Sequence, residues 1–180
     1  MRLTMMAVVG TALLAGMAWA QDGGGMDMSK MGPWSRKTNE AAVKKEIAAF
    51  FKEMDELEKK NDMAGVLAHI DFPVYMMTDD SKGVPKAGEW TKEMYEAVMK
   101  PMMENMPKDM KVTHKPTVTV LSDSLVNVVD DSTTTMGKQK MSARSLGVLV
   151  KRDGKWRWKV MGEAGWGDMP MPSASTPPAK

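Results

Sequence analysis

Two strand-like runs flank the turn sequence Arg152-Asp153-Gly154 near the end of the chain. Residues 144–151 and 155–166 read RSLGVLVK and KWRWKVMGEAGW, and both are rich in the β-branched and aromatic residues that favour strands. Glycine after aspartate is typical of the turn in a β-hairpin. The segment therefore predicts a hairpin, and with it a sheet in the C-terminal half of the chain.

The length of the hairpin loop decides which side chains share a face. A two-residue Asp-Gly turn mixes apolar and charged residues on both faces. A three-residue loop, with Gly154 in the left-handed conformation, instead pairs Val150 with Trp156 and Val148 with Trp158. Because the buried face fixes the register, we predict the three-residue loop and place both tryptophans in the core. The apolar residues left on the opposite face are Leu149 and Met161.

Helical patterning dominates the first half of the chain. Apolar residues recur at spacings of three and four between Asn39 and Lys60, as on one face of a helix. A short helix is expected over 63–70, a strand over 72–77, and a third helix from the N-cap Thr91 to about Lys100. A loop is expected over 79–89, and four further strands over 111–121, 125–136, 141–151 and 155–166. Helices followed by a run of antiparallel strands favour an α+β fold.

The two ends of the chain differ in amino-acid composition from its middle. Residues 1–20 have the basic start, apolar run and small-residue cleavage site of a secretory signal peptide, which predicts a periplasmic or secreted protein without a membrane anchor after cleavage. Residues 21–37 read as a disordered leader and residues 167–180 as a disordered tail rich in Pro and Ser. One domain is expected over 38–166. The formal net charge is +2 without a basic run, so nucleic acid is a poor candidate partner.

The order of these elements resembles that of the nuclear-transport-factor-2-like superfamily, which includes SnoaL-like polyketide cyclases and ketosteroid isomerases. The hairpin around Asp153-Gly154-Lys155-Trp156 is similar to the closing hairpin of many members. The resemblance implies a curved antiparallel sheet wrapped around three N-terminal helices as a cone-shaped α+β barrel with a cavity at its open end. It also implies possible homodimerisation through the outer sheet face, where Leu149 and Met161 would lie. Members include enzymes, ligand binders and interaction domains, so the fold does not choose a function.

Three polar residues interrupt the face of the sheet that we expect to be buried. If residues 137–139 form the next loop, Ser132 faces Arg144, and His114, Asp130 and Arg144 share that inward face. A cavity with a few convergent polar groups fits this pattern, and we predict that they line a ligand pocket with Tyr75 and Trp158. The alternative is a structural Asp130–Arg144 ion pair beside a satisfied histidine. Catalysis would need a base such as Asp130 and a donor such as Tyr75, but their spacing does not single them out.

Methionine is the second unusual feature, with 22 residues in a chain that has no cysteine. The spacing of Met26, Met28 and Met31 is similar to thioether clusters that hold Cu(I), which soft ligands select. General use of methionine in place of leucine explains the same count without a site. No other cofactor is expected. The sequence therefore favours an exported, non-catalytic domain that binds a small apolar or amphipathic ligand or a partner, with copper handling and cyclase- or isomerase-type catalysis as alternatives.

Overall fold

The computed structural model describes residues 37–107 and 109–169. The predicted signal peptide, nearly all of the predicted leader with Met26, Met28 and Met31, and most of the predicted tail lie outside these residues. Within them, no helix is long and apolar enough to cross a membrane.

Three helices follow the predicted patterns, and each begins at a capping side chain. They are α1 (Glu40–Lys59), α2 (Met63–Ala68) and α3 (Lys92–Glu104). The side chain of Asn39 accepts a hydrogen bond from the Ala42 amide at 3.1 Å, and those of Asp62 and Thr91 cap α2 and α3 in the same way. Helix α3 ends later than predicted, because it continues through Pro101 to Glu104.

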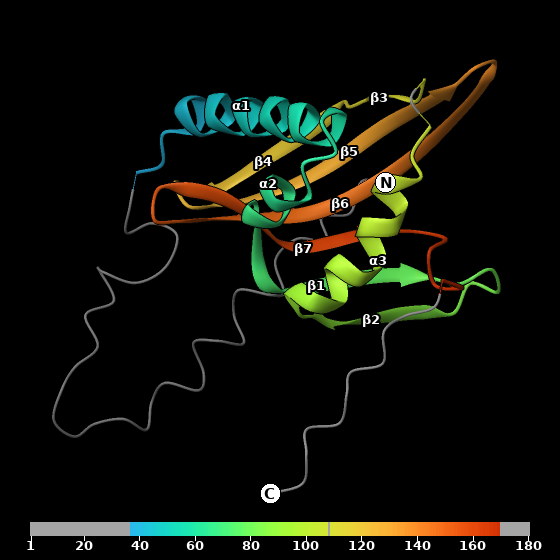
Figure 1. Cartoon of the computed structure of the whole chain (residues 1–180). Helices are drawn as coiled ribbons and strands as arrows, with labels where there is room; N and C mark the ends of the chain where they lie inside the picture. The colour runs from blue at the N-terminus through green and yellow to red at the C-terminus, as the bar shows by residue number, and fades with distance from the viewer. Residues whose placement is uncertain (1–36, 108, 170–180) are drawn as a thin grey trace, which may run out of the picture. The chain divides into compact units, whose positions relative to one another are not determined.

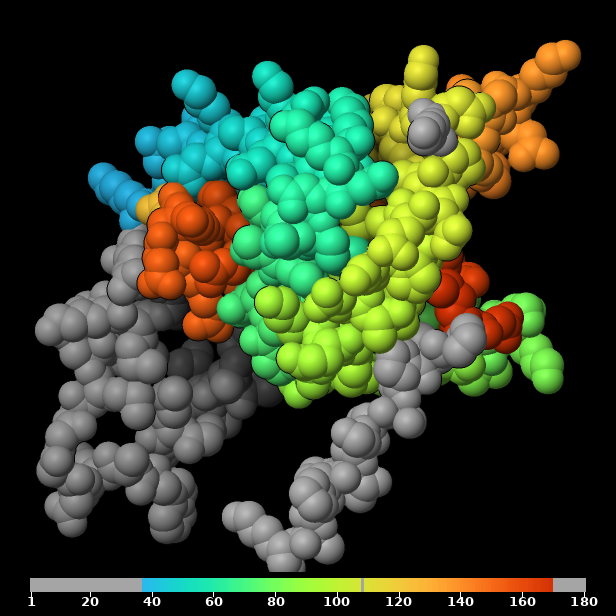
Figure 2. Space-filling view, viewed as in Figure 1, coloured from blue at the N-terminus to red at the C-terminus, as the bar shows by residue number. Residues whose placement is uncertain are grey.

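One curved sheet supplies the rest of the fold, and the helices cover one of its faces (Figure 1). Its order is β2-β1-β7-β6-β5-β3, and β4 also pairs with β5. Figure 2 shows the three helices forming one side of the molecule, with the β6–β7 hairpin beside α1. The strands are β1 (Ile70–Asp79), β2 (Pro85–Trp90), β3 (Lys111–Thr113), β4 (Pro116–Ser122), β5 (Leu125–Met136), β6 (Gln139–Arg152) and β7 (Lys155–Glu163).

The predicted α+β class is confirmed, with two differences in the sheet. Residues 85–90, expected to lie in a loop, form the edge strand β2, which pairs antiparallel with β1. Strands β1 and β7 run parallel, so the sheet is mixed rather than wholly antiparallel. Sequence patterning identifies strands but not their partners. The paired strands β1 and β7 are the first and last strands of the chain, so no local signal indicates that they are neighbours.

The predicted three-residue loop between β6 and β7 is wrong. Arg152 pairs with Lys155 across a two-residue turn, in which Asp153 and Gly154 have φ of 52° and 74°. Both values are positive, as a type I′ turn requires. A β-bulge then leaves Lys159 as an extra residue in β7, between the pair Leu149–Trp158 and the pair Val148–Val160.

The observed register changes which residues of the hairpin are buried. Trp156 and Leu149 are 6% and 0% exposed, so the tryptophan lies in the core as predicted and the leucine contradicts its predicted outward position. Met161 packs against the same core. These two residues therefore give no support to a dimer through the outer face. The residues that do face outward on β6 are Arg144, Leu146, Val148 and Val150.

Lys151 points toward the helices, where it pairs with the carboxylate of Glu46. Its Nζ lies 2.6 Å from Oε2 of Glu46 on α1, and the same oxygen accepts a hydrogen bond from Nε1 of Trp156 at 2.7 Å. The hydrogen bonds from Lys151 and then Trp156 hold the pKa of the Glu46 carboxyl below its ordinary value. This contact joins α1 to the β6–β7 hairpin and closes one end of the domain.

Candidate ligand-binding pocket

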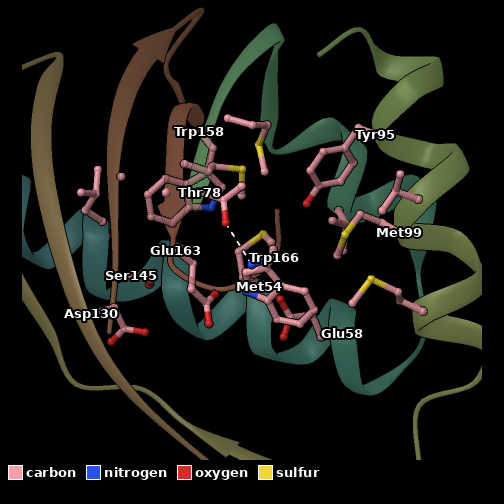
Figure 3. A pocket seen from close by; sticks show the side chains of 18 of the residues that line it. Met54, Glu58, Thr78, Tyr95, Met99, Asp130, Ser145, Trp158, Glu163 and Trp166 are labelled. Carbon is pink, nitrogen blue, oxygen red and sulfur yellow. Dashed lines mark hydrogen bonds between the residues drawn. The ribbon is translucent and has the colours of Figure 1, made fainter. Parts of the chain in front are cut away.

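A cavity of about 380 Å³ lies between the helices and the sheet. Its walls are mainly apolar and come from all three helices and from five strands, β1, β2, β5, β6 and β7. The C-terminal segment completes it, because Trp166 donates its backbone N–H to Oγ1 of Thr78 at 3.0 Å (Figure 3). Nine of the lining residues are methionines: Met54, Met76, Met77, Met99, Met102, Met103, Met106, Met161 and Met169.

A histidine–aspartate pair forms one polar part of the wall. The predicted β4–β5 register is confirmed, since Pro116 pairs with Asp130. Asp130 is 6% exposed and accepts hydrogen bonds from Nδ1 of His114 at 2.6 Å and from the Lys115 amide at 2.8 Å. Because an ionised carboxylate only accepts, Nδ1 carries the proton. The other ring nitrogen, Nε2, lies 3.6 Å from Oδ1 of Asp55 on α1.

Of the five predicted site residues, the structure brings three to the cavity: His114, Asp130 and Trp158. The ring of Trp158 packs edge-on against Phe50 and Phe51, at centroid distances of 5.6 and 5.9 Å. This packing fixes one wall of the cavity.

Arg144 and Tyr75 lie elsewhere, so their predicted inward positions are wrong. Met136 pairs with Gln139 across a two-residue turn, which shifts β6 by one residue and sets Arg144 opposite Asp131. The guanidinium binds that carboxylate from the outer face, with Nε 2.6 Å from Oδ1. Its hydrogen bond holds the pKa of Asp131 below the ordinary value. Tyr75 is 40% exposed on β1, opposite Val160.

The polar residues of the cavity that were missed from the sequence include Glu58, Tyr95 and Glu163. Glu58 lies four residues after Met54, which places both side chains on the same face of α1. Tyr95 and Met99 are related in the same way on α3. The spacing of four residues from an apolar position is the sequence signal that could have placed Glu58 and Tyr95 in the cavity. Glu163 could not be found, because its inward position follows from the bulge in β7.

Burial gives Glu58 and Tyr95 unusual acid–base properties. Loss of solvent raises the pKa of the Glu58 carboxyl above its ordinary value. Burial, together with the charge of Glu58, raises the pKa of Tyr95 to about 12. The tyrosine is therefore a neutral phenol at physiological pH, and the two groups are close enough to influence each other.

Glu58→Gln is expected to stabilise the protein at neutral pH. With its folded-state pKa raised, the carboxyl ionises more readily in the unfolded chain, so its contribution to stability falls as the pH rises above the unfolded value of about 4.3. An amide carries no such cost. In thermal unfolding, the variant should melt above the wild type at pH 7, and the difference should shrink toward zero below pH ~4. An unchanged or lower melting temperature at pH 7 would contradict the burial of this carboxyl.

Comparison with known proteins identifies the architecture. No family model and no curated protein matches the sequence. Among solved structures, an NTF2-like protein of unknown function from Pseudomonas putida KT2440 superposes with a TM-score of 0.58 at 14% identity, over 71% of this chain and 89% of its own. The chain has the nuclear-transport-factor-2-like fold. The predicted resemblance is thereby confirmed at the level of fold.

Two other structures with this fold show how different such proteins are. A putative scytalone dehydratase from Novosphingobium aromaticivorans has a TM-score of 0.52 at 11% identity, over 69% of this chain and 84% of its own. The association domain of CaMKII from C. elegans has a TM-score of 0.55 at 14% identity, over 69% and 96%. One name describes an enzyme and the other an assembly domain, so this nuclear-transport-factor-2-like chain must be interpreted from its own cavity.

The described residues of this nuclear-transport-factor-2-like domain place a broad apolar wall around the cavity rather than a cluster of charged metal ligands. In residues 37–107 and 109–169, no group of three or more His, Asp or Glu side chains is placed to hold a metal. The thioethers of the cavity are interleaved with aromatic rings and present a broad apolar wall. The copper prediction for Met26, Met28 and Met31 lies outside the described residues and stays a prediction.

Proposed function

We propose that this nuclear-transport-factor-2-like domain binds one small apolar or amphipathic molecule in the cavity between its helices and its sheet. The observation that carries the proposal is the cavity itself, about 380 Å³ with walls of thioethers and aromatic rings and a few polar groups. Ligand pockets have this composition and volumes of roughly 300–1,000 Å³. Methionine side chains are flexible and polarisable, so such a wall can adapt to the shape of its ligand.

We propose binding rather than catalysis, because the catalytic pair suggested by the sequence is not assembled. Both carboxylate oxygens of Asp130 already accept hydrogen bonds, from His114 and from the Lys115 amide. Tyr75, the suggested donor, lies on the outer face of the sheet. Asp130 is therefore better placed to orient His114 than to take a proton from a substrate.

Met99→Trp should weaken binding of the neutral apolar probe N-phenyl-1-naphthylamine at least tenfold. Met99 projects into the cavity from α3 (Figure 3), and an indole in its place would occupy part of the space that the probe needs. Fluorescence titration measures the affinity. The matched control is Met141→Trp, at a position on β6 that is 47% exposed and away from the cavity. Equal affinities for the two variants, or no binding by the wild type, would rule out this cavity as the site.

The cellular context and the assembly state are further parts of the proposal. The N-terminal sequence supports export with cleavage near Gln21, and the intact mass of the exported protein tests it.

Homodimerisation through the outer sheet face is supported by Leu146 and Leu121, which are 45% and 56% exposed there. Light scattering at micromolar concentration distinguishes a dimer from a monomer.

A further inference from the structure

The charged groups of the cavity are almost all of one sign. Five ionisable side chains other than tyrosine line it, of which four are carboxylic acids and one is a histidine: Asp55, Glu58, His114, Asp130 and Glu163. Among the residues that the structure describes, no lysine or arginine lines the cavity. Three lysines on strands that contribute to the wall pair with other carboxylates: Lys151 with Glu46, Lys159 with Asp71 and Lys86 with Asp80.

The single histidine balances only part of this negative charge. His114 contacts Asp130 at 2.6 Å and Asp55 at 3.6 Å, so these two carboxylates share one imidazole. Within residues 37–107 and 109–169, neither Glu58 nor Glu163 forms a salt bridge. The charges that act on Glu58 are those of His114 and Asp55, which oppose each other. Two carboxyl groups from opposite sides of the cavity therefore remain without a cationic partner in the described part of the chain.

Tyr95 is an independent sign that the cavity takes a polar group of a ligand. Its side chain is 4% exposed, and its hydroxyl points into the cavity rather than into the protein (Figure 3). No polar atom of the described residues hydrogen-bonds to this hydroxyl. Since no buried side-chain nitrogen or oxygen of the described residues lacks a hydrogen-bond partner, this hydroxyl is accessible from the cavity. It can therefore form a hydrogen bond with a polar group of a ligand.

We propose that the ligand is a cationic amphiphile, an organic ammonium ion whose nitrogen lies among Glu58, Glu163 and Tyr95 and whose apolar body lies against the methionine wall. The proposal rests on the binding function argued above and adds the charge of the ligand. A protonated amine donates hydrogen bonds and the three side chains can accept them. Aromatic rings of the wall, such as Trp158 and Trp166, further favour a cation. An anionic amphiphile would meet like charge without a basic residue to offset it.

Three ligands with the same apolar body isolate the effect of charge: 4-phenylbutylamine, 4-phenylbutan-1-ol and 4-phenylbutanoate. Isothermal titration calorimetry of the purified protein at pH 7 should show the amine binding at least tenfold more tightly than the alcohol, with no measurable binding of the acid. An alcohol or acid that binds as tightly as the amine overturns the cationic proposal while leaving the cavity function intact. Failure of all three ligands and of N-phenyl-1-naphthylamine overturns both.

Charge-removing variants locate the site within the cavity. Glu58→Gln and Glu163→Gln should each weaken the amine about tenfold and leave the alcohol within twofold of the wild type. Glu89→Gln is the matched control, because it removes the same charge from an exposed position on β2 and should change neither affinity. An equal loss in the control would indicate an effect of overall charge, and full retention of amine binding in both cavity variants would overturn the assignment. Thermal unfolding of each variant confirms that the fold is kept.

Discussion

Gly147→Val should destabilise the domain by about 3 kcal/mol, the upper part of the range for overpacked cores. A Cβ atom at this position would overlap Cζ3 of Trp158 and lie 2.8 Å from its Cε3, and it would lie 3.0 Å from the carbonyl oxygen of Val160. The indole cannot move aside freely, because Phe50 and Phe51 pack against its other sides. Chemical denaturation at neutral pH measures the loss.

Gly88→Val is the matched control for that substitution. Gly88 also lies in a strand, but a Cβ there would have no other atom within 4 Å. The control should therefore lose less than ~1 kcal/mol, or gain slightly from the better strand propensity of valine. The comparison also tests the register of the hairpin. With the three-residue loop, residue 147 would face solvent, and both variants would behave alike.

Asp130→Ala should also destabilise the domain by about 3 kcal/mol, since it removes an acceptor shared by two partly buried donors. Nδ1 of His114 would lose its acceptor, and the Lys115 amide would keep only its hydrogen bond to the carbonyl oxygen of Asp131, at 3.1 Å. Asp130→Asn should lose less, because the amide oxygen can still accept from Lys115. Denaturant titration at pH 7 orders the three proteins.

Asp131→Ala is the control for Asp130, one residue further along the same strand. Its carboxylate faces outward and pairs with Arg144, whose side chain is 72% exposed. Exposed ion pairs contribute ~1 kcal/mol or less, so this variant should remain close to the wild type. If both substitutions cost the same, the Asp130 interactions contribute little beyond a surface pair.

Local signals in the sequence identified the helices and the core strands correctly. Thr91 caps α3 as predicted, and Asn39, at which the predicted first helix begins, caps α1. Trp90 and Tyr95, on either side of the Thr91 cap, are both buried with ring centroids 6.5 Å apart, as in a hydrophobic staple. Each of these features depends on residues close together in the chain, which is why patterning was sufficient.

Register was harder to predict, because it depends on partners far away in the sequence. The two-residue turn at Asp153-Gly154 mixes apolar and charged residues on both faces of the hairpin and places Lys151 on the same face as Trp156. In the structure that lysine does point inward, and Glu46 on α1 satisfies it. Nothing near Lys151 in the sequence indicates such a partner. The bulge at Lys159 then places Met161 and Glu163, instead of Val160, on the inner face of the sheet.

The candidate site was predicted only as far as the registers were right. The β4–β5 pairing was correct, so Asp130 was placed in the cavity with His114. A shift of one residue in the β5–β6 pairing moved Arg144 from the inner face to the outer one. The loss of Arg144 changes the chemistry of the cavity, because it removes the one strong cation that the sequence had assigned to it.

The methionine wall also makes the cavity accessible to spectroscopy without any substitution. Nine of the chain's 22 methionines surround this one space. Each carries a terminal methyl group at the end of a mobile side chain, which gives a sharp nuclear magnetic resonance signal when labelled with ¹³C. A molecule entering the cavity would shift this set of signals together, whereas a molecule bound to the outer sheet face would leave it in place. Uniform methionine labelling would thus locate the ligand from the pattern of shifted methyls alone.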